Sequence, residues 1–151
     1  MRRVSSITLV LGSVALLLLP SVSVHAQDSA PRKIKDGEAA VITTAMPDAD
    51  ATAKVKAYLN AKNIDFTVNQ ETGRVISDWF DERGCGIGFN KCANRANVRV
   101  SSEGGQSVIN VQVFERKREA GINPKPWNES SKSKGKATAE FADALEAYLK
   151  K

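Results

Sequence analysis

Two cysteines stand close together in a glycine-rich stretch of the chain. Cys85 and Cys92 are interleaved with Gly84, Gly86 and Gly88, and glycine gives so short a ring the backbone freedom to close. We therefore predict a structural disulfide between Cys85 and Cys92. The alternatives are a redox dithiol, which is usually spaced Cys-x-x-Cys, and a metal clip, which needs further ligands that the sequence does not supply nearby.

Three carboxylates precede this loop. Asp78, Asp81 and Glu82 could serve as an acid and base pair if the fold held two of them at a set separation in a cleft. Acidic residues at the end of a strand are more often solvated turn formers. We therefore predict no catalytic residues and keep a small hydrolase that uses this cluster as an alternative.

Histidine chemistry is excluded by composition. The chain of 151 residues has one histidine, His25, and it lies in a segment that is predicted to be removed. No Ser-His-Asp or Cys-His pair can then be built, and two cysteines alone cannot make a four-cysteine zinc site. We predict neither a metal site nor a cofactor.

Residues 1–26 have the pattern of a signal peptide. Arg2 and Arg3 precede an apolar run from Ile7 to Leu19, and small or tolerated residues lead to a cleavage point before Gln27. The run is shorter than the roughly 20 residues that span a bilayer. The sequence thus predicts export to the periplasm, with secretion from the cell as the alternative. It predicts no transmembrane segment after cleavage.

The remaining charge is a mild excess of cations. Removing Arg2 and Arg3 lowers the net charge from +5 to +3. A nucleic-acid binder normally shows a concentrated basic face and a recognisable module, so we predict no nucleic-acid partner. The two densest basic runs, 116–118 and 132–136, are expected to be a solvated strand end and a solvated linker.

Periodicity divides the mature chain into elements. Apolar residues recur at helical spacing after Asp48, which with Asp50 is a candidate helix cap, and alternate with polar residues in the middle of the chain. The expected elements are a flexible lead-in (27–38), a possible strand (39–45), a helix (48–63), two hairpins (66–76 and 96–113), an irregular linker (120–135) and a closing helix from residue 136.

Neither helix can bury its apolar stripe alone, and the strands have one apolar face. The economical solution is an α+β fold in a single domain over residues 39–151: a two-layer sandwich with an antiparallel sheet of about four strands and both helices packed on one face.

Aromatic and apolar side chains in loops are the candidate binding residues. Trp79, Phe80, Ile87 and Phe89 lie in or beside the cysteine loop, and loops on a rigid scaffold commonly carry recognition. Trp127 lies in the polar linker. It either fills a gap in the core, which we favour, or stays exposed to meet a partner.

The order of elements resembles a known family. Segments 55–59, 64–68, 72–77, 95–100 and 107–113, followed by a closing amphipathic helix, are similar in layout to the small BamC-like domains of bacterial outer-membrane assembly lipoproteins. The resemblance implies an envelope protein that scaffolds or binds other envelope components. Family members are typically lipid-anchored through an N-terminal cysteine, and no cysteine lies near residue 27.

From the sequence we expect a non-catalytic periplasmic binding or scaffolding module whose partner is an envelope protein or a glycan. Two other functions remain open. The chain could inhibit an exported enzyme by presenting the disulfide-bound loop as a rigid plug, or it could be the small hydrolase considered above.

Overall fold

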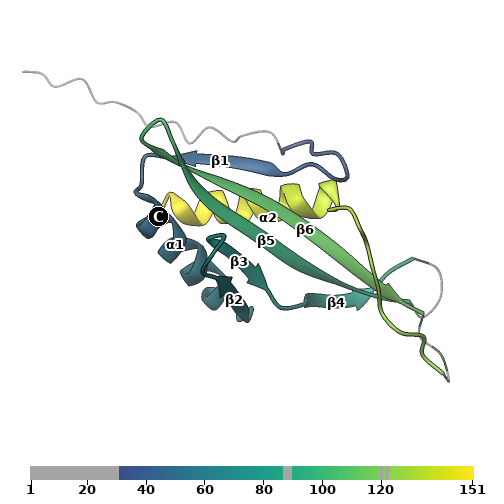
Figure 1. Cartoon of the computed structure of the whole chain (residues 1–151). Helices are drawn as coiled ribbons and strands as arrows, with labels where there is room; N and C mark the ends of the chain where they lie inside the picture. The colour runs from purple at the N-terminus through teal and green to yellow at the C-terminus, as the bar shows by residue number, and fades with distance from the viewer. Residues whose placement is uncertain (1–30, 87–89, 120, 122) are drawn as a thin grey trace, which may run out of the picture.

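The described part of the chain forms one antiparallel sheet and two helices. The computed structural model describes residues 31–86, 90–119, 121 and 123–151. Its elements are β1 (Ala40–Thr44), α1 (Asp48–Ala61), β2 (Phe66–Asn69), β3 (Arg74–Ser77), β4 (Phe80–Gly84), β5 (Lys91–Glu103), β6 (Gln106–Arg118), β7 (Asn128–Glu129) and α2 (Gly135–Leu149). The predicted α+β class is confirmed (Figure 1).

The long β5–β6 hairpin is the axis of the sheet. Its two strands pair along their whole length, from Glu103 opposite Gln106 to Lys91 opposite Arg118. Gly104 and Gly105 form the tight turn, and both have positive φ, the conformation that a two-residue hairpin turn of the I′ type requires. The strand order is β1-β6-β5-β3-β2, with β4 beside β5 and β7 beside β6.

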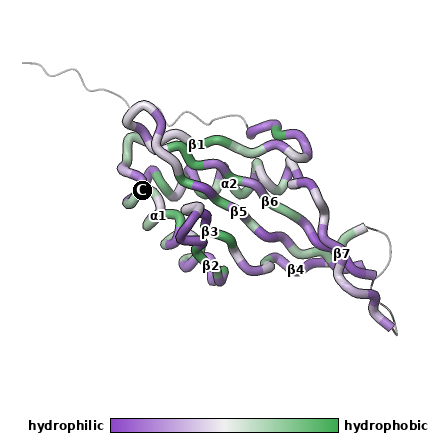
Figure 2. Tube along the Cα trace, in the orientation of Figure 1, coloured by the Kyte–Doolittle hydropathy of each residue, from purple (hydrophilic) through white to green (hydrophobic). Residues whose placement is uncertain are grey.

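Both helices pack on the same face of the sheet. The fully buried side chains there include Val98 and Val111 from the hairpin and Val55, Leu59 and Leu145 from the helices. Burying such a side chain contributes about 1.5–3 kcal/mol to stability. Figure 2 shows the hydrophobic residues gathered where the sheet faces the helices and hydrophilic residues toward the β4–β7 end.

The sheet is larger than the four expected strands: β1 forms within the possible strand at 39–45, and β4 and β7 are strands that the sequence did not predict. β4 pairs with β5 where β3 has ended, and β7 pairs with β6 where β1 has ended. Polar and charged residues dominate both strands, whose burial pattern lacks a fully buried position. Such segments carry no period-2 apolar signal, so the hydrogen-bonding edges of the long hairpin determine these strands.

The segment before β1 was expected to be a flexible lead-in, but residues 32–37 contact the start and the outer face of α2. The side chain of Arg32 forms ion pairs with Asp143 and Glu146 of that helix. The Asp36 carboxylate accepts a hydrogen bond of 2.8 Å from the backbone N–H of Gly135. That bond lowers the pKa of Asp36, so this cap is present when the carboxylate is ionised.

The cap predicted for the first helix is not formed. Pro47 occupies the N-cap position of α1, and no side chain caps that end of the helix. The carboxylate of Asp48 instead accepts a hydrogen bond from the hydroxyl of Ser107 on β6. A tertiary contact therefore replaces the local cap.

Gly135 is the first residue of α2, and its Cα lies against the backbone of the lead-in. An added Cβ would come far closer than 3.0 Å to the carbonyl group of Ile34. We predict that Gly135→Ala lowers the free energy of unfolding, measured in urea, by more than about 2 kcal/mol. This is the opposite of what helix propensity alone predicts, because alanine stabilises a helix more than glycine does. Gly84→Ala is the control, because a Cβ there meets nothing within 4 Å; equal stability of the two variants would contradict the packing described.

Candidate binding site

The end of the sheet that carries β4 and β7 projects past the helices (Figure 1). At its tip Cys85 and Cys92 form the predicted disulfide, with their Cα atoms 5.8 Å apart. The backbone N–H of Cys85 donates a hydrogen bond of 3.0 Å to the carbonyl of Asn90. The disulfide therefore closes the end of the β4–β5 hairpin. Ile87 and Phe89, two predicted binding residues, lie outside the described part of the chain.

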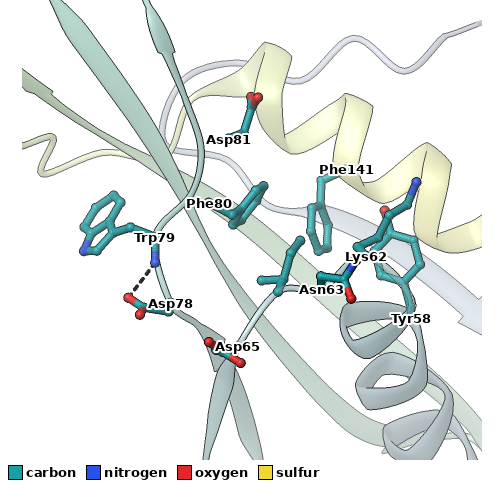
Figure 3. A pocket seen from close by; sticks show the side chains of 10 residues that line it. Tyr58, Lys62, Asn63, Asp65, Asp78, Trp79, Phe80, Asp81 and Phe141 are labelled. Atoms are coloured by element: carbon teal, nitrogen blue, oxygen red, sulfur yellow. Dashed lines mark hydrogen bonds between the residues drawn. The ribbon is translucent and has the colours of Figure 1, made fainter.

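Trp79 lies on the face of the sheet that the helices leave uncovered, which we call the open face. The neighbouring Phe80 points to the helix side, while Trp79 points away from it (Figure 3). The guanidinium carbons of Arg95 and Arg116 each lie 4.5 Å from the centroid of the Trp79 ring. The indole of Trp79 thus joins one arginine of β5 to one arginine of β6.

Trp127 continues the same arrangement from the other side. The guanidinium carbon of Arg116 lies 4.2 Å from the centroid of the Trp127 ring, and that of Arg118 lies 4.6 Å from it. Trp127 therefore does not fill a gap in the core, and that prediction is wrong. It does fold the linker back onto the domain, but it packs against the open face.

These five side chains form one contact series, Arg95, Trp79, Arg116, Trp127 and Arg118, which we call the Trp–Arg ladder. Each cation–π contact of this kind contributes about 0.5–1 kcal/mol at an exposed site and more when water is excluded. Both tryptophans are half-buried. The ladder links β5, β6 and the two segments that carry the tryptophans.

The ladder concentrates positive charge that carboxylates offset only in part. Glu129 pairs with Arg95 at 3.1 Å, and Glu82 lies 4.0 Å from Arg118 and 2.9 Å from the Nζ atom of Lys91. The hydrogen bond from Lys91 lowers the pKa of Glu82, and the nearby arginines add to the effect. The Nε atoms of Arg116 and Arg118 are buried without a hydrogen-bond partner in the described structure.

A second feature, a pocket of about 580 Å³, lies on the helix side of the same region. Part of its wall is aromatic: the ring of Phe141 packs 5.4 Å from that of Tyr58 and 5.9 Å from that of Phe80, measured between centroids. Burial raises the pKa of the Tyr58 hydroxyl, so this group is a neutral hydrogen-bonding group at physiological pH.

Carboxylates lie around the rim of that pocket. Asp65 and Asp78 lie at one end and Asp81 at the other (Figure 3). Asp78 accepts a hydrogen bond of 2.7 Å from the backbone N–H of Trp79, and Asp81 pairs with Arg83 at 2.8 Å. Of the predicted acidic cluster, Asp78 and Asp81 therefore share the pocket. Glu82 does not line it and instead pairs with Lys91.

In the described residues no group of three or more His, Cys, Asp or Glu side chains is arranged to hold a metal ion.

The three arginines of the ladder are not among the predicted site residues, and the expectation that residues 116–118 form a solvated strand end is wrong for Arg116 and Arg118. Arg116 and Arg118 are separated by two positions on β6, so their side chains share a face. That face is the open one, which Arg95 also occupies. The signal in the sequence was the alternation of Arg116 and Arg118 in a chain with two tryptophans in polar surroundings. Only the structure shows that the five residues meet.

No protein-family model matches this chain, and no curated protein matches it in sequence.

The disulfide closes a small ring at the projecting end. Its loss increases the conformational entropy of the unfolded chain and so favours unfolding. We predict that replacing Cys85 and Cys92 together by serine lowers the free energy of unfolding by roughly 2–3 kcal/mol without abolishing the fold. The melting temperature would fall by about 4–8 °C for each kcal/mol. Differential scanning calorimetry of both forms measures this, with reduced wild-type protein as the matched control. Two reactive thiols in the natively purified protein would contradict the prediction.

Proposed function

We propose that the chain is an exported, non-catalytic binding module of a bacterial cell envelope. The observation that carries the proposal is the Trp–Arg ladder, which fixes three planar cations on an uncovered sheet face at the projecting end of the molecule. Side chains held in place before binding lose less entropy when a partner arrives. A ladder of this kind is therefore suited to recognition.

Export rests on two separate features. The sequence of residues 1–26 has the pattern of a signal peptide, and the disulfide is a bond that persists in oxidising compartments such as the periplasm. Among the described residues no helix is long and apolar enough to cross a membrane. The similarity of element order to BamC-like domains supports an envelope role as part of the same proposal.

A second candidate function uses the tip instead of the ladder. The disulfide between Cys85 and Cys92 restrains the end of the β4–β5 hairpin, as expected of a rigid loop that inserts into the active site of another protein. This would be an inhibitor of an exported enzyme, and it predicts that binding depends on residues 87–91 and not on the arginines of β6.

We predict that tagged mature protein retains an envelope component that Arg118→Glu fails to retain. Reversing the charge at the end of the ladder repels an anionic partner and breaks one stacking contact, so recovery should fall at least roughly tenfold. Affinity capture from solubilised envelopes, quantified by mass spectrometry and glycan staining, measures it.

Lys56→Glu on α1 is the matched control, since it makes the same charge reversal in the helix layer. Equal recovery by the wild type and by both variants would contradict a role for the ladder. Loss of recovery caused only by alanine substitution across residues 87–91 would favour the inhibitor.

A further inference from the structure

The open face carries arginines beyond the ladder, toward the middle of the sheet. Arg74 of β3 lies directly opposite Arg99 of β5 in the strand register. Both side chains are exposed, and neither has a hydrogen bond or an ion pair in the described structure. Like charges placed directly opposite each other on a sheet are destabilising. The free protein therefore bears a repulsion that an anion bound between the two guanidinium groups would relieve.

Amide side chains lie beside this pair of arginines on the open face. Asn97 is on the same face of β5, between Arg95 and Arg99, and Asn110 of β6 lies opposite Arg99. Neither amide has a hydrogen-bond partner in the described structure. An amide offers two donors and one acceptor, so these two side chains can bind hydroxyl groups while the arginines bind acidic groups.

The composition of the open face distinguishes among polyanions. Each indole of the ladder already stacks two guanidinium groups, so neither is free to stack bases as a single-stranded nucleic acid requires. Val41 is the one large hydrophobic side chain in the described chain that is strongly exposed, at 53%. The face therefore lacks the apolar cluster that inserts into a lipid surface.

We propose that the open face binds an extended acidic polysaccharide. Its acidic groups lie against Arg74 and Arg99 and against the ladder arginines, and its hydroxyls bind Asn97 and Asn110. The inference rests on the proposed function as a binding module and names the class of partner. Charge complementarity carries the proposal. Glu129 pairs with Arg95 and Glu82 lies near Arg118, and both of these arginines belong to the ladder. Arg74 and Arg99 have no carboxylate partner in the described structure, so they can bind the acidic groups of a ligand.

The experiment is a salt titration of binding to a size-defined heparin oligosaccharide, a probe with sulfates, carboxylates and hydroxyls. We expect Arg74→Gln with Arg99→Gln to weaken binding roughly tenfold at low salt and to reduce the slope of log K against log salt by about two. The same double variant should melt at the same temperature as the wild type or higher, because the repulsion is gone. A folding defect would instead lower it.

The matched control removes two charges from the helix layer and chain end, Lys56→Gln with Lys151→Gln, and should change heparin affinity less than twofold. Poly-L-glutamate, single-stranded DNA and phosphatidylglycerol vesicles are the competing probes. Binding of any of these as tightly as heparin, equal weakening by both double variants, or no binding of heparin would overturn the inference. If heparin fails while envelope capture still depends on Arg118, the binding module stands and its partner is not an acidic polysaccharide.

Discussion

A mismatch of lengths between the central hairpin and the helices dictates much of this structure. Each strand of the hairpin has 13 residues, about 43 Å at ~3.3 Å per residue, whereas α2 has 15 residues, about 22 Å. The backbone N–H of Val113 bonds to Thr138 near the start of α2, so residues 114–118 extend past that helix. The disulfide, β4, β7 and the Trp–Arg ladder stabilise the part of the hairpin that the helices leave uncovered.

This division explains what the sequence could predict. The alternation through Val98 and Val100 and the helical spacing of Val55 and Leu59 reflect burial against a shared core, and both elements form where periodicity places them. The strands β4 and β7 have no such core to face. They form because β5 and β6 present unpaired edges beyond β3 and β1, a property of the whole sheet that a local pattern does not contain.

The candidate site was partly visible in the sequence for the same reason. Cysteines in a short glycine-rich loop indicate their own pairing, and Cys85 and Cys92 do pair. Trp79 and Trp127 are candidate binding residues in the sequence, but the arginine that joins them, Arg116, belongs to a different segment, a run that resembles a solvated strand end. Guanidinium groups cover apolar rings and keep their charge, so a ladder stabilises the uncovered end and leaves it cationic. Under the proposed function, the side chains that stabilise this end are also the ones that bind the partner.

The coupling between Arg116 and Trp127 tests this account most directly. A double-mutant cycle in urea, using Arg116→Gln, Trp127→Leu and both together, isolates the stacking energy from the other effects of each substitution. The ladder predicts a coupling of about 0.5–2 kcal/mol that favours the native pair. Additive effects of the two substitutions, with no coupling, would show that the ladder neither holds the projecting end together nor fixes its cations.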